Sequence, residues 1–136
     1  MDFLKSIAIA ASGLRAQAGR MRVISENLAN SDSTAQTPGS DPFRRKIATF
    51  RSEMDRALDA RTVELSRVRN DPSDFRLKHE PGHPAADANG NVKYPNVNAL
   101  IEMNDMREAQ RSYEANINVI GATRRMIQRT LDILKV

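Results

Sequence analysis

Two stretches at opposite ends of the chain decide its fold: FLKSIAIAASGLRAQAGRMRVISENL, residues 3–28, and MNDMREAQRSYEANINVIGATRRMIQRTLDIL, residues 103–134. In both, apolar side chains recur at alternating steps of four and three residues. Such a repeat is typical of a coiled-coil seam, where each apolar side chain fits between residues of a facing helix. The sequence therefore predicts a mainly α protein whose long N- and C-terminal helices pack as an antiparallel coiled-coil-like pair. A small β or extended segment is expected between the two helices.

Each stripe is apolar except at a few positions. The stripes comprise Phe3, Ile7, Ala10, Leu14, Met21, Ile24 and Leu28 at the N-terminal end, and Met103, Met106, Tyr113, Ile117, Ile120, Ile127, Leu131 and Leu134 at the C-terminal end. Gln17, Gln110 and Arg124 occupy the polar positions. Polar seam residues can fix the register of a coiled coil, and supercoil drift can equally place them at its edge, so both interpretations stay open.

Two glycines, Gly13 and Gly19, lie inside the predicted N-terminal helix. Glycine in a helix interior costs about 1 kcal/mol relative to alanine. With the neighbouring alanines, these glycines form a small-residue surface that permits close approach of another backbone. They can equally be weak positions that the helix tolerates.

The chain divides into a terminal helical region, residues 1–35 and 97–136, and a loop with a small extended segment, residues 36–96. Asp2 is expected to cap the first helix or to supply an acid in its first turn, and Asn96 or Asn98 is expected to cap the second helix. Residues 31–42 combine polar turn formers with two prolines and a glycine, which predicts a loop.

Alternation and turn residues in the middle of the chain predict short strands over residues 43–50, 63–68, 75–78 and 92–94. A helical turn or two is expected over residues 54–60. Asn89-Gly90 is typical of a tight turn between strands. These pieces suffice for a small β element, not for a large β domain.

Bulk composition excludes several classes of protein. No apolar run approaches the length of a transmembrane helix, and the absence of cysteine excludes disulfides and thiolate metal sites. The net charge of +4 permits an acidic partner, but the basic residues are scattered among acids. The tightest basic cluster, residues 44–46, has few aromatic neighbours for stacking on bases. Residues 7–11 are too short for the apolar core of a secretory signal, so we expect a mature helix without a cleaved signal peptide.

Two patterns in the chain resemble chemical sites without meeting their requirements. His79-Glu80-Pro81-Gly82-His83 has the spacing of a zinc-protease helix, but its proline and glycine break the helix that the ligands need. Asp87-Ala88-Asn89-Gly90 has glycine at the wrong position for a calcium loop and predicts a hairpin turn.

Acids at 102, 105 and 108 lie beside Arg107 and Arg111, which predicts an exposed, salt-bridged helix face. No enzymatic activity, metal or cofactor is therefore expected. From residues alone, a coiled-coil adaptor is favoured over a basic nucleic-acid-binding protein, and an enzyme comes last.

Three groups of residues together resemble one known family. SGLRAQ at 12–17, RMRVISENLAN at 20–30 and Thr34 resemble the N-terminal signature of bacterial flagellar rod and hook proteins. EPGHPAAD at 80–87, Asn89-Gly90, Val92 and PNVN at 95–98 are similar to the proximal-rod member of that family, and Met103, Met106 and EAQRSYEAN at 108–116 resemble its C-terminal signature. The chain departs from the family at residues 31–33, which lengthen a spacing, and at Asn91, which replaces an aromatic residue.

The resemblance implies a structural subunit of the proximal rod of the flagellar basal body. It implies export without a cleaved signal peptide, a rod that spans the periplasm, and polymerisation through terminal helices into a drive shaft that transmits torque. The implied partners are further copies of the chain, other rod proteins, a membrane-ring adaptor and the distal rod, with no nucleic acid and no membrane insertion.

The expected assembly surface follows the two stripes. It comprises Phe3, Ile7, Leu14, Met21, Ile24, Leu28, Asn30, Met103, Met106, Tyr113, Ile117, Ile120, Ile127 and Leu131. An isolated amphipathic helix is marginally stable in water, so we hypothesise that the terminal stretches become fully helical on assembly.

Overall fold

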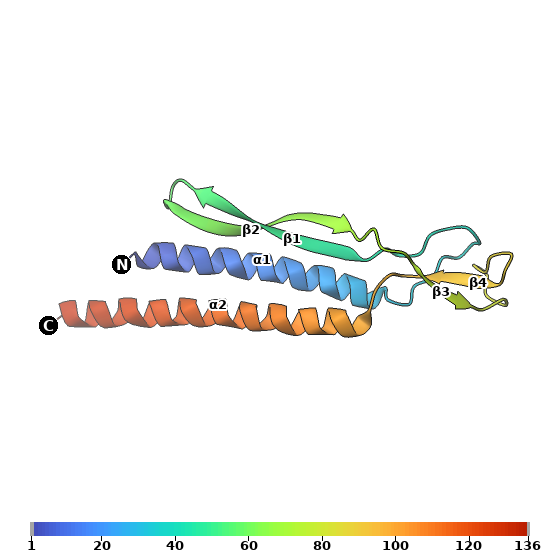
Figure 1. Cartoon of the computed structure of the whole chain (residues 1–136). Coiled ribbons are helices and arrows are strands. Elements are labelled where there is room, and N and C mark those ends of the chain that lie inside the picture. The colour runs from blue at the N-terminus through green and yellow to red at the C-terminus, as the bar shows by residue number, and fades with distance from the viewer. Residues whose placement is uncertain (1, 136) are drawn as a thin grey trace. The chain divides into compact units, whose positions relative to one another are not determined.

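A computed structural model describes residues 2–135 of the chain (Figure 1). Two long helices form at the ends of the sequence, and the strands of two small sheets come between them in the sequence. The elements in order are α1 (Phe3–Ala29), β1 (Lys46–Asp55), β2 (Ala60–Asn70), β3 (Arg76–His79), β4 (Asn91–Tyr94) and α2 (Ala99–Leu134). The predicted mainly α fold with a small β segment is confirmed; the ends of the predicted helical region, Met1 and Val136, lie outside the described residues.

The chain folds into two compact units, each built from separate stretches of sequence. Unit 1 comprises the residues up to Met21, Thr49–Arg67 and the residues from Arg107 onward. Unit 2 comprises Arg22–Ala48 and Val68–Met106. Among the described residues, neither helix is long and apolar enough to cross a membrane.

Side-chain caps set the first turn of each helix. The Asp2 carboxylate accepts the Lys5 N–H at 3.2 Å, as the sequence predicted for the start of α1. The Asn98 side-chain oxygen accepts the N–H groups of Leu100 at 3.0 Å and Ile101 at 3.4 Å. Asn98 is therefore the cap of α2, and Asn96 serves a different purpose described below.

Strands β1 and β2 form a two-stranded sheet whose strands are longer than predicted. Charged residues such as Arg51 and Glu64, whose side chains meet at 3.1 Å, interrupt the apolar alternation that strand prediction relies on. The helical turn expected over residues 54–60 is wrong. Met54 lies in the last part of β1, and β2 begins at Ala60. The Asp55 carboxylate accepts the N–H groups of Ala57 and Leu58 and so closes a tight turn between the two strands.

Strands β3 and β4 pair antiparallel within unit 2, with Arg76 opposite Tyr94 and His79 opposite Asn91. The segment between them contains the predicted turn at Asn89-Gly90. The Asp87 carboxylate accepts the N–H groups of Asn89 and Asn91, both at 2.8 Å. Gly90 has φ +77°, and a Cβ there would lie 2.9 Å from the His79 ring. Only glycine suits this backbone and this space.

Small residues of α1 allow close approach within unit 1. An added Cβ at Gly19 would lie 2.9 Å from the Leu65 side chain of β2, and one at Gly13 would lie 2.9 Å from the Asn116 amide of α2. The buried Ser12 hydroxyl accepts the Val63 N–H at 3.1 Å. At both glycines the nearest atoms of the facing element belong to a side chain, so close packing is observed, whereas close approach of another backbone stays a prediction.

Gly13 and Asn116 should therefore be energetically coupled. We expect Gly13→Ala alone to change stability little, because improved helix propensity is offset by the clash with the Asn116 amide. In an Asn116→Ala background, the same change should stabilise the chain by about 1 kcal/mol. A double-mutant cycle in urea measures this coupling, and an equal effect of Gly13→Ala in both backgrounds would contradict it.

Candidate functional site: helix surfaces and a polar cluster

Helix α2 carries two neighbouring columns of residues that differ in exposure. The inner column is Glu102, Ala109, Asn116 and Thr123; Glu102, Ala109 and Thr123 are buried and Asn116 is half-buried. The outer column is Met103, Gln110, Ile117, Arg124 and Leu131. Met103, Ile117 and Leu131 are 49%, 47% and 47% exposed, and Gln110 and Arg124 are also exposed.

At every second position of the predicted stripe of α2, the residue that packs inward is thus the one just before the predicted residue in the sequence. Met106, Tyr113, Ile120 and Ile127 are half-buried, in keeping with the stripe. The expectation that the outer column packs against α1 within one chain, however, is wrong. Ala109, Asn116 and Thr123 lie buried or half-buried instead, since small side chains permit the close approach seen at Gly13.

Helix α1 shows a broader buried surface than its stripe. Within the stripe, Ala10 and Ile24 are buried, and Phe3, Ile7, Leu14, Met21 and Leu28 are half-buried. Asn30, which follows the helix, is also half-buried. Ser12, Ala16, Val23 and Asn27 are buried as well, although they lie outside the stripe. The reason is that α1 contacts both a strand and a helix, as Ser12 with Val63 and Gly13 with Asn116 show. The Gln17 side-chain oxygen is buried without a hydrogen-bond partner among the described residues.

Helix α2 extends past the N-terminal end of α1 in unit 1 (Figure 1). It has 36 residues, whereas α1 has 27. Leu131 is 47% exposed, and Ile133 and Leu134 are each 74% exposed. The last turns of α2 therefore present large apolar side chains to solvent.

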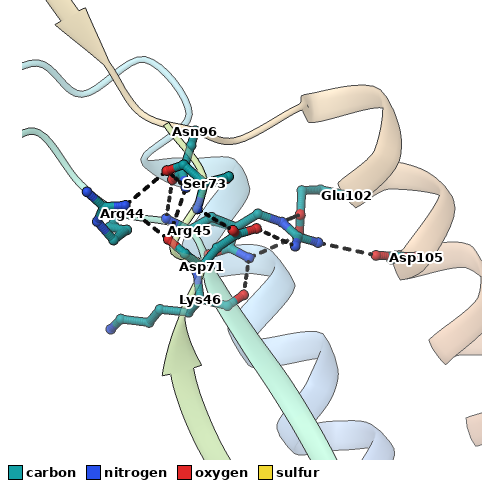
Figure 2. A network of polar contacts seen from close by, with 9 residues as sticks. Arg44, Arg45, Lys46, Asp71, Ser73, Asn96, Glu102 and Asp105 are labelled. Carbon is teal, nitrogen blue, oxygen red and sulfur yellow. Dashed lines mark hydrogen bonds and ion pairs between the residues drawn. The ribbon is translucent and has the colours of Figure 1, made fainter. Parts of the chain in front are cut away.

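Unit 2 contains a polar cluster formed by Asn27, Arg45, Asp71, Asn96 and Glu102 (Figure 2). Glu102 is 1% exposed. One oxygen of its carboxylate accepts the Arg45 Nε–H at 2.5 Å, and the other accepts the Asn27 amide at 3.1 Å. The guanidinium of Arg45 also pairs with Asp71 at 3.2 Å and with Asp105 at 3.8 Å. The buried carboxylate is thus neutralised and hydrogen-bonded on both oxygens, which is what burial of a charge requires.

Two asparagines tie this cluster to the backbone. The Asn27 side chain exchanges two hydrogen bonds with the backbone of Lys46, at 2.8 and 2.9 Å, as a neighbouring strand would. The Asn96 oxygen accepts the Arg45 N–H at 2.8 Å, and its amide donates to the carbonyls of Asp71 and Ser73 (Figure 2). The start of β1 is therefore held by side chains from α1 and from the segment that precedes α2.

Several predicted roles for charged residues change as a result. The expected exposed face with Arg107 and Arg111 is wrong for Glu102, which is buried and bound to residues far away in sequence. Asp105 also pairs with Arg45, and Glu108 pairs with Arg20 at 3.3 Å. A run of alternating charges along a helix carries no sign of a partner on another element, so sequence reasoning missed this cluster.

The basic cluster at residues 44–46 is engaged inside unit 2. Arg44 donates to the carbonyls of Asp71 and Ser73 at 3.1 and 3.0 Å, and its guanidinium lies 4.1 Å from the centre of the Phe75 ring. Lys46 forms an ion pair with Glu26. These contacts occupy the side chains that gave the basic nucleic-acid-binding interpretation its best support.

The charges of the cluster shift two pKa values. Burial opposes the charge on Arg45, but hydrogen bonds and attraction from Glu102 and Asp71 outweigh burial and raise its pKa. The pKa of Asp71 is lowered, chiefly because its carboxylate accepts the Ser73 N–H at 2.9 Å, with further contributions from the Ser73 side chain and Arg45.

Asp71 should therefore contribute to the acid sensitivity of the fold. Because its pKa is lower in the folded than in the unfolded chain, its stabilisation is present above the unfolded value of about 3.9. It is lost as the pH falls through the folded pKa. Urea unfolding between pH 2 and 6 should show a smaller loss of stability for Asp71→Asn than for the unaltered chain. Equal losses would contradict this role.

The two histidines bond to different partners, both near and far in the sequence. His83 Nδ1 lies 3.0 Å from the Ala85 N–H that it accepts, and its Nε2 lies 3.2 Å from the Thr34 hydroxyl. His79 Nδ1 lies 3.4 Å from the Asn91 side-chain oxygen. His83 thus joins the segment between β3 and β4 to the loop after α1, whereas His79 bonds across the β3–β4 pair.

Comparison with known proteins finds one family throughout the chain. Residues 7–35 match the family described as "Flagella basal body rod protein", and residues 88–133 match "Flagellar basal body rod FlgEFG protein C-terminal". The chain is 54% identical over 136 residues to the flagellar basal-body rod protein FlgC of Agrobacterium fabrum, covering 99% of this chain and 98% of that protein.

More distant relatives bear the same name. Identity is 39% over 150 residues to FlgC of Bacillus subtilis, covering 99% of this chain and all of that protein. It is 38% over 133 residues to FlgC of Salmonella typhimurium, covering 98% of each. Such identity over whole chains shows common descent and a shared fold, and the family is one of structural proteins rather than enzymes. The chain therefore belongs to the flagellar basal-body rod protein family.

Proposed function

We propose that the chain is a structural subunit of the proximal rod of the bacterial flagellar basal body, polymerising through its terminal helices into the drive shaft that transmits torque. The observation that carries this proposal is the row of large apolar side chains left exposed on α2, in a chain whose relatives are named rod proteins. Exposed apolar surface of this kind marks an interaction site.

The two helices act as an antiparallel, coiled-coil-like pair in this proposal. Three contacts support it: Gly13 approaches Asn116, Arg20 pairs with Glu108, and Asn27 bonds to Glu102. Residue numbers rise in steps of seven along α1 while they fall along α2. Residues 1–35 and 97–136 then form the helical rod part, and residues 36–96 supply contacts with neighbouring subunits.

The assembly surface combines half-buried and exposed positions with one buried residue, Ile24. We assign to it Phe3, Ile7, Leu14, Met21, Ile24, Leu28, Asn30, Met103, Met106, Tyr113, Ile117, Ile120, Ile127 and Leu131. Half-buried residues can serve both the chain's own helix pair and a neighbour, whereas the outer column of α2 is free for a neighbour. A shaft needs such contacts to repeat head to tail without closing, and close-packed side chains resist sliding under torque.

The same proposal gives the partners and the location. The chain joins copies of itself, other rod proteins, the membrane-ring adaptor and the distal rod, within a rod that spans the periplasm. It leaves the cytoplasm without a cleaved signal peptide. The outer turns of its terminal helices, beyond the helix pair that forms in the single chain, become fully helical on assembly. Circular dichroism of dilute monomer should therefore show less helix than the assembled form.

Genetic complementation tests the proposal directly. A tagged copy of the chain is expressed in a flagellated bacterium that lacks its own proximal-rod gene of this family. We expect restored swimming and the full-length tagged chain in purified basal bodies. Cells that produce the chain without swimming, with basal bodies that lack it, would refute the proposal.

A further inference from the structure

Helix α2 packs its less apolar column inward, which burial of apolar surface alone does not explain. The inner column has three polar residues among four, whereas the outer column has three large apolar residues among five. Adjacent positions on a helix differ by about 100°. Turning α2 by that amount would bring Met103, Ile117 and Leu131 toward α1, which the hydrophobic effect favours.

The polar residues of the inner column differ in where their hydrogen bonds go. The Asn116 amide donates to the Ser112 carbonyl at 2.8 Å, and the Thr123 hydroxyl donates to the Val119 carbonyl at 2.9 Å. Both acceptors lie on α2 itself, so these bonds survive any turn of the helix.

Glu102 is different, because its partners lie on other elements. Its two oxygens accept hydrogen bonds from Asn27 of α1 and from Arg45 beside β1. Turning α2 would carry this carboxylate away from both donors. Arg45 would then lose the partner that lies closest to it and keep only Asp71 among the partners outside α2, and a largely buried charge with less compensation is costly.

We propose that the polar cluster selects the rotational setting of α2, with Glu102 as the positioning residue. The bonds to Asn27 and Arg45 hold the inner column against α1 and so keep Met103, Ile117 and Leu131 on the outside. Without them, α2 turns to bury the outer column. Buried polar groups that specify one packing over a more apolar alternative are known in helical assemblies.

The rotational setting of α2 matters because it decides which column of residues is exposed. The role of the outer column as a contact for a neighbouring subunit rests on the proposed function. The rotational setting itself is a property of the single chain, so a test on isolated monomer separates the two. A chain that fails to assemble into a rod could still show the proposed rotational setting of α2. A monomer that lacks this setting could still be a rod subunit.

Disulfide trapping reads the setting, because the chain contains no cysteine of its own. The inner pair is Gly13→Cys with Asn116→Cys. An added Cβ at residue 13 lies 3.1 Å from the Asn116 Cγ, an atom that the sulfur of a cysteine at 116 would replace, so the two cysteines are close enough to form a disulfide. The outer pair is Gly13→Cys with Ile117→Cys. The outer pair also carries Asn116→Ser, so that the new Cβ at residue 13 meets no larger side chain.

Each pair is oxidised in dilute monomer, with and without Arg45→Met/Glu102→Leu, which removes the charges of Arg45 and Glu102 together. With the cluster intact, the inner pair should cross-link faster than the outer pair by at least about tenfold, since only correctly placed Cβ atoms form the bond. In the double variant this preference should fall at least about tenfold. A matched change in the exposed pair, Arg51→Met/Glu64→Leu, should leave it unchanged.

A preference for the inner pair that persists in the folded double variant would overturn the proposal. If the double variant proves unfolded by circular dichroism, Glu102→Gln decides instead. Glutamine keeps the shape and one acceptor but loses the charge, so the preference should fall by a smaller, measurable factor. No change with Glu102→Gln would then overturn it.

Discussion

Replacing Glu102 by alanine should lower the free energy of unfolding by about 3 kcal/mol, at the low end of the range for breaking a buried ion pair. The carboxylate is 1% exposed and accepts bonds from Arg45 and Asn27. Its removal leaves the Arg45 guanidinium with only the partial compensation of Asp71 and Asp105. The effect stays near the low end because the Arg45 side chain is 21% exposed and retains some water.

Urea unfolding followed by circular dichroism measures this change. Glu64→Ala is the matched control, because Glu64 also pairs with an arginine but is 52% exposed. Exposed ion pairs contribute little to stability, so the control midpoint should match that of the unaltered chain. Equal loss in both variants would show that the cluster has no special role.

Replacing Ile117 by aspartate should abolish swimming while leaving the isolated chain folded. Ile117 lies on α2 at 47% exposure, so a charge there costs little in the monomer. In the rod, the same position is proposed to pack against a neighbouring helix, where an unpaired carboxylate would be buried at high cost. The Ile117 variant is therefore expected to have a defect in rod assembly without a defect in folding.

Two measurements are needed for this prediction. Urea unfolding of the purified variant should match the unaltered chain closely, and complementation should give non-motile cells with normal amounts of the protein. The control is Asn118→Asp, which places the same charge at the next, exposed position of α2, outside the assigned surface. Normal swimming of the Ile117 variant would remove this residue from the assembly surface.

Much of the fold followed from local pattern. The long helices were predicted because apolar residues recur over many turns, and the loop after α1 because prolines and polar turn formers leave no periodicity. The β1–β2 pair was underestimated because charged cross-strand partners such as Arg51 and Glu64 disguise its strands. The turn at residues 56–59 was missed because one side chain, Asp55, closes it.

The functional surface was only partly accessible from sequence. An apolar ladder identifies Ile120 and Ile127, but it cannot distinguish a column that packs within the chain from one left exposed. Ala109 and Thr123 are buried although their side chains are small or polar. Asn27 and Glu102 meet across 75 residues of sequence, and no local pattern reports such a pair.

The sequence by itself determined the two amphipathic helices, a cap at Asp2, a cap at Asn96 or Asn98, and the family motifs, because these depend on residues within a turn or two of one another. The tertiary structure decided which side of α2 faces inward. That choice depends on donors from α1 and from the start of β1, which reach Glu102 only once the chain has folded. A buried carboxylate and its distant partners thus determine which apolar residues remain exposed.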